Sequence, residues 1–182
     1  MTERAGEQHT RLQMHGSGEV CRQVLATLPA WFGIPESVED YVATAEANPT
    51  VVASVDGRDV GLLTLVVHTQ YAAEIYLMGV RAEHHRLGLG RAMLATAESW
   101  LAERGVEFLQ VKTQSARRED DGYAKTRAFY LASGFRPLQE FPELWDHDNP
   151  ALQMIKVVSR AAPSPAPTPV LAPEPGAGSG DR

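Results

Sequence analysis

The chain has 182 residues and a formal net charge of −6, which is the size of one domain with a buried core. The acidic balance argues against a nucleic-acid-binding protein, because such a protein needs a basic face to neutralise phosphates. The sequence has no run of 18 apolar residues, so no membrane span is expected, and the polar N-terminus lacks the apolar stretch of a signal peptide. Cys21 is the only cysteine, so we expect a helix-core thiol, no metal site and a reducing, cytoplasmic setting.

The N-terminal part of the chain predicts a short strand followed by two helices. Residues 1–9 are polar and are expected to form a flexible lead-in, and the alternation of residues 11–15 favours a strand. Ser17 is a candidate N-cap, because a serine oxygen can accept a hydrogen bond from the first turn of a helix. A second helix is expected over residues 37–47. The residues expected to face the core are Val20, Val24, Leu25 and Leu28 in the first helix and Val38, Tyr41, Val42 and Ala45 in the second.

Two large rings, Trp31 and Phe32, lie in the turn between these helices. Rings in a turn either close a hydrophobic core or form a wall of a ligand pocket, since aromatic side chains commonly line pockets. The sequence leaves both roles open.

Three apolar runs, over residues 50–55, 60–67 and 71–80, follow the helices. They are rich in β-branched residues, and Asp56-Gly57 between the first two is a hairpin turn signal. We therefore expect an antiparallel meander of three strands.

An amphipathic helix is expected next, over residues 88–104, with Gly105 as its C-terminal cap. Residues 106–111 then predict a strand. Because a helix connects this strand to the run that ends at Val80, the two strands should be parallel neighbours. The apolar positions of the helix are Leu89, Met93, Leu94, Ala97 and Leu101.

The last part of the domain predicts a loop over residues 114–122, a helix over 123–133 that ends at Gly134, and strands over 135–141 and 152–158. The helix is expected to turn four residues partly inward, namely Ala124, Ala128, Phe129 and Leu131. The linker between the two strands is expected to be a loop that carries Glu140, Glu143, Asp146 and Asp148.

A loop with two glycines, His85-Arg86-Leu87-Gly88-Leu89-Gly90, joins the third strand of the meander to the long helix. A glycine loop that opens a helix points unpaired backbone N–H groups, and the positive end of the helix dipole, at an anion. The glycines would let a phosphate approach the main chain, and Arg86 and Arg91 add positive charge. The motif is not a P-loop, and Met93 stands where a dinucleotide fingerprint needs a third glycine. A loop that only turns the chain is the alternative.

This hexapeptide resembles the Q/R-x-x-G-x-G/A signature by which GNAT acetyltransferases hold the pyrophosphate of acetyl-CoA, with His85 in place of Gln or Arg. A second stretch, Ala128-Phe129-Tyr130-Leu131-Ala132-Ser133-Gly134-Phe135, resembles the family's A-x-x-FY-x-x-x-GF signature, whose tyrosine lies near the coenzyme sulfur. The resemblance implies an α+β fold, with a GNAT-like mixed, mostly antiparallel sheet flanked by helices and a central parallel pair splayed to hold acetyl-CoA. It covers residues 10–160, and residues 161–182, rich in Pro, Ala and Gly, are expected to form a disordered tail.

The resemblance also implies which residues contact the coenzyme. The main chain of Met78, Gly79 and Val80 would bond to the pantetheine arm as if to a neighbouring strand, and Gly79 suits a β-bulge there. Tyr123 stands where the family often has an Asn that contacts the coenzyme. The remaining implied coenzyme contacts are His85, Arg86, Leu87, Gly88, Leu89, Gly90, Arg91 and Tyr130.

Direct attack of an amine on a thioester needs a group that takes a proton and a group that gives one to the leaving sulfur. By resemblance, Tyr130 is the candidate acid, with a core tyrosine as the alternative. Glu74 is the candidate base, with a solvent-facing glutamate as the alternative, and strand alternation puts it on one face with Tyr76 and Met78. His68 and Tyr76 are further candidates for the base, although a lone His in an apolar strand is more often structural.

The expected activity is transfer of acetyl from acetyl-CoA, as co-substrate, to the primary amine of a small molecule. The acidic run Glu140–Asp148 either attracts a cationic acceptor or forms a solvated loop. Two other functions stay open, namely acetylation of a protein N-terminus or lysine, and a non-catalytic acetyl-CoA-binding sensor. No nucleic-acid or membrane partner is expected, and the protein is expected to be a monomer or a homodimer.

Overall fold

The computed structural model describes residues 7–32 and 35–158 of the chain. The first half contains, in order, β1 (Gln8–Gln13), α1 (Gly18–Leu25), α2 (Pro35–Ala47), β2 (Thr50–Val55), β3 (Arg58–Val67) and β4 (Ala72–Val80). The second half contains a short 3₁₀ helix, η1 (Ala82–His84), then α3 (Leu89–Glu103), β5 (Phe108–Gln114), α4 (Asp121–Ala132), β6 (Arg136–Asp146) and β7 (Asn149–Val157). Most of the lead-in and all of the tail expected from the sequence lie outside the described residues.

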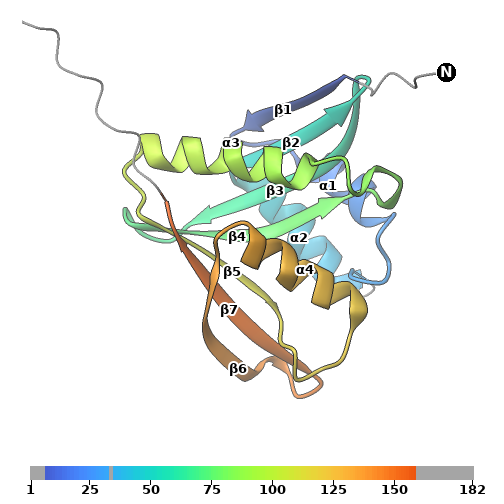
Figure 1. Cartoon of the computed structure of the whole chain (residues 1–182). Helices are drawn as coiled ribbons and strands as arrows, with labels where there is room; N and C mark the ends of the chain where they lie inside the picture. Colours follow the sequence, from blue (N-terminus) through green and yellow to red (C-terminus); the bar gives the residue numbers. More distant parts are fainter. Residues whose placement is uncertain (1–6, 33–34, 159–182) are drawn as a thin grey trace, which may run out of the picture.

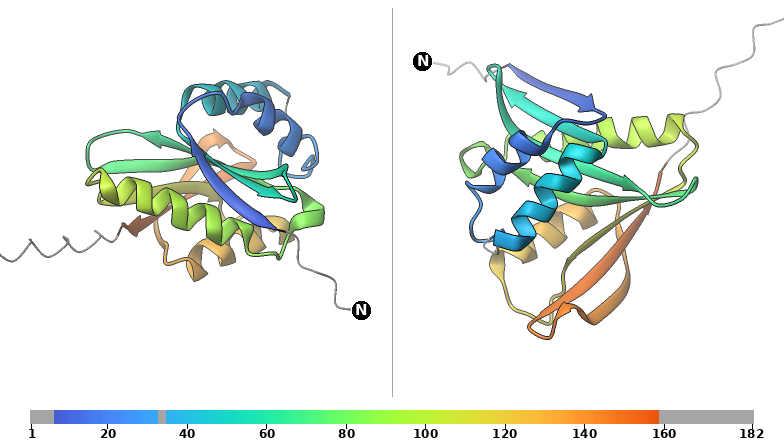
Figure 2. Two further views of the ribbon diagram at one scale, coloured as in Figure 1. Left: turned by 90° about the horizontal axis from the view of Figure 1, so that it is seen from above. Right: turned by 180° about the vertical axis from the view of Figure 1, so that it is seen from behind.

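The strands form one sheet in the order β1-β2-β3-β4-β5-β7-β6 (Figure 1). All neighbouring strands are antiparallel except β4 and β5, which are parallel. Helices α3 and α4 cover one face of the sheet, and α1 and α2 cover the other (Figure 2). The expected mixed, mostly antiparallel fold with one parallel pair is therefore confirmed.

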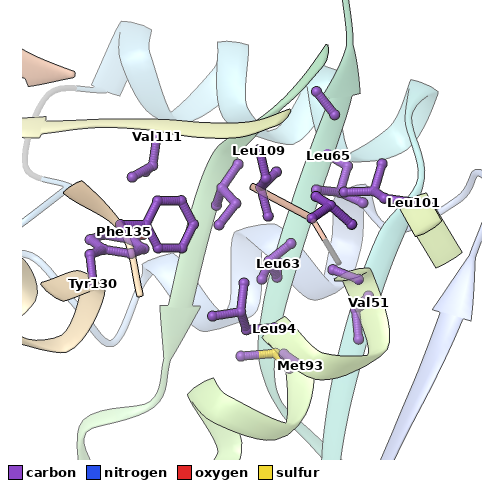
Figure 3. Packing of buried hydrophobic residues seen from close by; sticks show 14 of the residues in the cluster. Val51, Leu63, Leu65, Met93, Leu94, Leu101, Leu109, Val111, Tyr130 and Phe135 are labelled. Carbon is purple, nitrogen blue, oxygen red and sulfur yellow. The ribbon is translucent and has the colours of Figure 1, made fainter. Parts of the chain in front are cut away.

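The larger hydrophobic cluster lies between the sheet and the α3–α4 face (Figure 3). All five apolar positions expected for the long helix are at most 4 % exposed. Burial of a Leu side chain contributes about 1.5–3 kcal/mol, so this face fixes α3 on the sheet. The helix ends as expected at Gly105, whose φ is +75°, and Val106 donates its N–H to the carbonyl of Leu101 at 3.1 Å, the hydrogen-bond pattern of a Schellman motif.

A second, smaller cluster lies between the sheet and the opposite helices, α1 and α2. Cys21 is fully buried in it, as expected for a helix-core thiol, and burial raises the pKa of this thiol to about 12. The cap expected at Ser17 is wrong. Its hydroxyl donates to Gln13 Oε1 at 2.9 Å, and the first N–H of α1, from Gly18, instead donates to the Glu46 carboxylate of α2 at 3.0 Å.

Two expected strand boundaries are also wrong, namely the start of β1 and the end of β6. β1 begins at Gln8, three residues earlier than expected, because its backbone pairs with β2 as far as Val55. β6 continues through the expected acidic loop to Asp146. Side chains from other segments stabilise the acidic residues of this strand. Arg117 Nε forms an ion pair with Glu140 Oε2 at 2.8 Å, and Asn149 donates a hydrogen bond to Asp146 at 2.8 Å.

The inward face expected for the last helix is wrong at three of its four positions. Ala124, Ala128 and Leu131 are exposed, and Phe129 is half-buried. Tyr130 is the buried residue of α4, so the helix meets the core over a narrow stripe near its C-terminal end.

Candidate active site

The parallel strands β4 and β5 pair over only four residue pairs, from Ala72–Phe108 to Ile75–Val111. Beyond Ile75, β4 remains paired with β3 on one side, and beyond Val111, β5 remains paired with β7 on its other side. Beyond Ile75 and Val111, the facing edges of β4 and β5 are therefore not paired with each other. This separation is the splay expected for the central parallel pair.

A β-bulge lies in β4 at Tyr76, and not at Gly79 as expected. Leu65 of β3 is opposite Ile75, and Thr64 is opposite Leu77, so one residue of β4 has no partner. Gly79 has a packing role instead, because a Cβ there would lie 3.2 Å from Leu28 Cδ1 of the segment that follows α1. The absence of a side chain lets this segment approach the sheet.

The bulge changes which side chains share a face of β4. Glu74 and Tyr76 share a face, as expected. It is the α1–α2 face, where Tyr76 packs against the smaller core cluster. Met78, expected on the same face, packs instead against the cluster beneath α3, as does Val80. A bulge adds one residue, which reverses the alternation beyond it.

The register also sets the direction of the backbone groups at the end of β4. Arg81 donates its N–H to Val60 of β3 at 2.8 Å. Antiparallel alternation then turns the backbone groups of Gly79 toward β3 and those of Met78 and Val80 toward the side from which β5 has diverged. Of the three main-chain contacts implied by the family resemblance, the geometry favours those of Met78 and Val80.

The loop between β4 and α3 presents a run of free backbone donors. Among the described residues, none accepts a hydrogen bond from the backbone N–H groups of residues 86–91. Gly88 has a φ of +84° and open space where a Cβ would lie, and Arg86 adopts the left-handed region with a φ of +66°. Both arginines of the motif, Arg86 and Arg91, are exposed. Six consecutive free donors at the positive end of a 15-residue helix make a binding site for an anion.

The other residues of this loop have separate structural roles. His85 Nε2 lies 2.7 Å from the carbonyl oxygen of Val80, and because a carbonyl only accepts, this nitrogen carries the hydrogen. His85 therefore ties the loop to the end of β4. A Cβ at Gly90 would lie 3.3 Å from the Phe129 ring, so this glycine lets α3 and α4 approach each other. Leu89 is buried, whereas Leu87 is 48 % exposed.

Tyr130 lies near the C-terminal end of α4 and is 4 % exposed. Its ring meets those of Phe129 and Phe135 edge to face, with centroids 5.3 Å away in each pair. Burial raises the pKa of Tyr130 above the usual value of a phenol. The phenol therefore stays protonated at neutral pH, which is the state that a proton donor needs.

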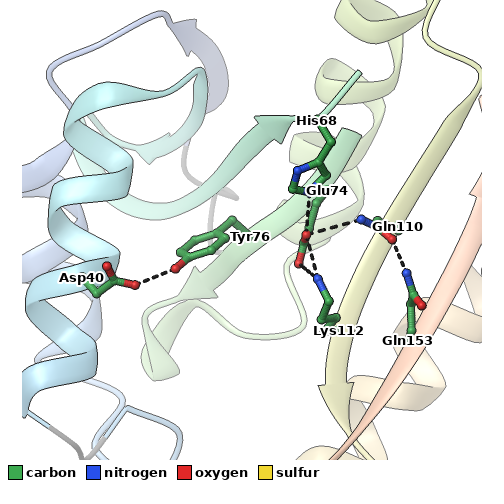
Figure 4. Close-up of polar contacts among 7 residues, drawn as sticks. All are labelled: Asp40, His68, Glu74, Tyr76, Gln110, Lys112 and Gln153. Atoms are coloured by element: carbon green, nitrogen blue, oxygen red, sulfur yellow. Dashed lines mark hydrogen bonds and ion pairs between the residues drawn. The ribbon is translucent and has the colours of Figure 1, made fainter. Parts of the chain in front are cut away.

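Glu74 is buried within a polar cluster on the α1–α2 face of the sheet (Figure 4). Lys112 Nζ lies 2.7 and 2.8 Å from its two carboxylate oxygens, and His68 Nε2 lies 2.7 Å from Oε2. Gln110 donates to the same oxygen at 3.4 Å and itself accepts a hydrogen bond from Gln153 of β7. Three candidate residues from the sequence, Glu74, His68 and Tyr76, thus lie on one face, and the first two are in direct contact.

A second polar pair lies further along β4 on this face. Tyr76 donates its hydroxyl hydrogen to Asp40 of α2 at 2.6 Å, and burial together with this carboxylate raises the pKa of Tyr76 to about 12. The other members of these clusters, Asp40, Lys112, Gln110 and Gln153, are not among the candidates predicted from the sequence. The last three were detectable in principle, because they are polar residues at alternate positions of otherwise apolar strands.

The aromatic turn between α1 and α2 has one of the two roles that the sequence left open, because both rings pack against the smaller core cluster. Phe32 packs on Tyr41 with centroids 5.5 Å apart, inside the smaller core. Trp31 lies 6.4 Å from the His85 ring and so close to Gly122 that a Cβ there would lie 2.9 Å from Trp31 Cζ2. Trp31 therefore lies between the loop after β4 and the first turn of α4. Tyr123, in the same turn, is half-buried, and burial raises its pKa.

The described residues contain no helix with the length and hydrophobicity needed to cross a membrane. Within residues 7–32 and 35–158, no three His, Cys, Asp or Glu side chains lie close enough to hold a metal ion together.

The sequence matches a model of the acetyltransferase (GNAT) family over residues 22–135, well over half of the chain. The fold is similar to that of a Desulfovibrio desulfuricans protein assigned to the GNAT acetyltransferases, with a TM-score of 0.73 and 19 % identity over 84 % of this chain and 100 % of the other. It is also similar to the ribosomal-protein-S18-alanine N-acetyltransferase of Escherichia coli, with a TM-score of 0.65 and 18 % identity over 85 % and 97 % of the two chains.

A third similar structure is an aminoglycoside 6'-N-acetyltransferase complexed with coenzyme A, with a TM-score of 0.66 and 16 % identity over 84 % of this chain and 99 % of the other. No curated protein matches the sequence closely enough to count as a relative. The family match and the fold agree. The chain belongs to the GNAT family of acetyltransferases, and it is an acyltransferase.

Proposed function

We propose that this protein transfers the acetyl group of acetyl-CoA to the primary amine of a small molecule. The observation that carries the proposal is the run of free backbone N–H groups over residues 86–91, beside the edge where β4 and β5 separate. A pyrophosphate offers several anionic oxygens, so it suits several donors along one loop. The open space at Gly88 and the exposed guanidinium groups of Arg86 and Arg91 fit the same ligand.

The rest of the coenzyme would extend from this loop along β4. The backbone groups of Met78 and Val80 face the diverging strand, so an extended pantetheine arm can bond to them as an added strand does. The carbonyl of Val80 already accepts the His85 hydrogen bond, which leaves its N–H and both groups of Met78 for the arm. One of these N–H groups would also stabilise negative charge on the thioester oxygen, a contribution of about 3–4 kcal/mol.

Acetyl-CoA supplies an activated acetyl thioester, and the protein supplies proton transfer and orientation. In the proposal, Tyr130 gives its hydroxyl proton to the leaving sulfur. Its raised pKa keeps the phenol protonated until sulfur becomes negative. The Glu74 cluster lies on the α1–α2 face, and we assign to it removal of a proton from the incoming amine.

Trp31 supports a small acceptor, because aromatic side chains commonly line small-molecule pockets. It lies beside His85 of the donor loop and Gly122 in the first turn of α4. The aminoglycoside enzyme among the similar structures acts on a small molecule, as its name states. The Escherichia coli enzyme acts on an alanine of a ribosomal protein, so peptides belong in any test of the acceptor.

Calorimetric titration with acetyl-CoA tests the coenzyme site. Gly88→Glu should weaken binding at least 100-fold, because it puts a carboxylate at the open position and strains a left-handed residue. Arg86→Gly should weaken it about tenfold or more, since glycine keeps the left-handed backbone and removes one charged donor. Arg104→Gln at the other end of α3 makes the charge more negative by one, as both variants do, so it is the matched charge control and should leave the affinity unchanged. Full affinity in Gly88→Glu would remove this loop as the coenzyme site.

A panel of amines, assayed by release of the coenzyme thiol, tests the reaction. The panel should contain polyamines, aminoglycosides, simple alkylamines and short peptides with free N-termini or lysines. Thiol release that depends on a small amine supports the proposal. Release with peptides alone would show a protein acetyltransferase, and tight acetyl-CoA binding with no release on any amine would show a sensor.

A further inference from the structure

The buried carboxylate of Glu74 is poorly placed to take a proton from a substrate amine. Its side chain is 8 % exposed, and its oxygens face Lys112, His68 and Gln110. Three of these contacts go to Oε2, and the ion pair with Lys112 also holds Oε1, so the carboxylate is stabilised in its ionised form inside the protein. A base must offer a lone pair to the proton that it abstracts, so the proton acceptor should be another member of the cluster.

His68 is the member of the cluster that reaches solvent. Its side chain is 41 % exposed, and it follows the last residue of β3, on the same face as Glu74 and Tyr76 (Figure 4). Lys112, also in contact with Glu74, is 28 % exposed, but as an ammonium group it has no lone pair to offer. Gln110 is an amide and does not take a proton at neutral pH.

The contact with Glu74 fixes which ring nitrogen of His68 is free. An ionised carboxylate only accepts hydrogen bonds, so His68 Nε2 carries the hydrogen of this 2.7 Å contact. In the neutral ring, Nδ1 then has the lone pair. Lys112 balances the charge of Glu74, so the carboxylate orients the ring without requiring a second positive charge on it.

We infer that His68 is the general base of the acetyl transfer and that Glu74 is its positioning residue, an inference that rests on the proposed function. His68 Nδ1 takes one proton of the substrate ammonium group, directly or through one water molecule, and passes it to solvent. The nitrogen lone pair then forms the C–N bond as the C–S bond breaks with its electron pair on sulfur. Sulfur takes the Tyr130 proton, and Tyr130 regains a proton from the new amide nitrogen through water, so the balance is one amide, one thiol and one released proton.

The first test compares His68→Gln with the wild type on two acceptors. Gln keeps a donor for Glu74 but has no basic nitrogen, and His15→Gln, at an exposed histidine far along the chain, is the matched control. With the most active alkylamine of the panel, which is mostly protonated near neutral pH because its pKa is about 10, His68→Gln should lower kcat about 100-fold with KM for acetyl-CoA unchanged. With the O-alkyl hydroxylamine analogue, which is already neutral, the loss should be less than about fivefold.

Equal losses on the two acceptors would show that His68 only shapes the site, and would overturn the inference. His68→Ala gives an independent check, because added imidazole can replace a missing base. Recovery of alkylamine turnover with imidazole supports the inference, and the absence of recovery in a folded His68→Ala protein counts against it.

A readout that needs no turnover tests the orientation of the ring. In the free protein with ¹⁵N-labelled histidine, the His68 signal, identified by its loss in His68→Gln, should show a hydrogen on Nε2 and an unprotonated Nδ1 near pH 8. In Glu74→Gln the ring should lose this single tautomer. A doubly protonated His68 near pH 8, or the other tautomer, would exclude Nδ1 as the base.

Failure of the inference can be told apart from failure of the proposed function. If the wild type releases no thiol with any amine, the proposed function fails. Normal wild-type turnover with an unaffected His68→Gln overturns only the role of His68.

Discussion

Phe135 donates its backbone N–H to the carbonyl of Tyr130 at 3.0 Å, and the rings of the same two residues meet with centroids 5.3 Å apart. Gly134 between them has a φ of +94° and donates its N–H to Leu131 at 3.1 Å. These are the two hydrogen bonds and the apolar contact of a Schellman motif at the end of α4. The glycine and phenylalanine of the second signature therefore hold the tyrosine of the same signature in place.

Gly134→Ala should destabilise the protein by about 1–2 kcal/mol, because a left-handed residue with a Cβ is strained. The new Cβ would also lie 3.4 Å from Lys156 Cε, an ordinary contact, so strain dominates. Urea unfolding measures the change. Ser99→Ala, at an exposed position of α3, is the control and should shift stability by less than about 0.5 kcal/mol. Equal stability of Gly134→Ala and wild type would contradict this account of the cap.

Tyr130→Phe keeps the ring contacts and removes only the hydroxyl. Turnover should fall about 100-fold if this hydroxyl protonates the leaving sulfur, while calorimetric affinity for acetyl-CoA changes little. Phe129→Leu, at the preceding residue, changes packing without removing a proton donor and serves as the comparison. Unchanged turnover in Tyr130→Phe would return Tyr130 to the role of a core tyrosine.

Much of the fold was predictable because its patterns are local. The five apolar positions of α3, the hairpin at Asp56-Gly57 and the glycine caps each follow from a few neighbouring residues, and the parallel pair follows from connectivity. The bulge at Tyr76 was not predictable, because one unpaired residue leaves no mark on an apolar run. The part of β6 beyond Phe141 was missed because its acidic residues look like a loop until Arg117 and Asn149, from other elements, are brought beside them.

The ion pair between Glu74 and Lys112 gives a second stability prediction. Lys112→Met should cost about 1–3 kcal/mol, because it leaves a buried carboxylate without its cation. Adding Glu74→Gln should recover most of this loss, since a neutral amide needs no cation. Urea unfolding of both single variants and the double variant gives the coupling energy, with Lys125→Met on the exposed face of α4 as the control. Additive losses would show that the pair has no net coupling.

Cys21 makes stability depend on alkaline pH. Burial raises the pKa of this thiol to about 12 in the folded protein, against about 8.5 in an unfolded chain. Because the unfolded thiol ionises first, its contribution to stability is complete below pH ~8.5 and is lost as pH rises toward 12. The free energy of unfolding should fall by at most about 1.4 kcal/mol for each pH unit above that point.

Denaturant unfolding of the wild type and Cys21→Ala between about pH 8 and 10 measures this dependence. Above this range four tyrosines, whose pKa values are also raised, add their own ionisation. The difference in stability between the two proteins should shrink as pH rises through this window. A constant difference would show that the folded thiol ionises as readily as the unfolded one.

The candidate site was predictable where it depends on contiguous residues and less so where it depends on the sheet. The donor loop is one hexapeptide, and its free N–H groups follow from a glycine turn before a helix. The Glu74 cluster draws on β3, β4, β5 and β7, so its members are far apart in sequence. Glu74 and His68 were each recognised as candidates, but their contact depends on the register of β3 against β4, which composition does not determine.

The ladder between β4 and β5, which joins the first four strands of the sheet to the last three, is four residue pairs long. Helix α3 contacts the first group and α4 the second, so this short ladder is a seam in the sheet, above which both groups share the larger hydrophobic cluster. A ligand that bonds to β4 and reaches toward β5 would lengthen that seam. Binding of the coenzyme would then also make the whole domain more rigid. The protein without coenzyme would be the more flexible of the two forms.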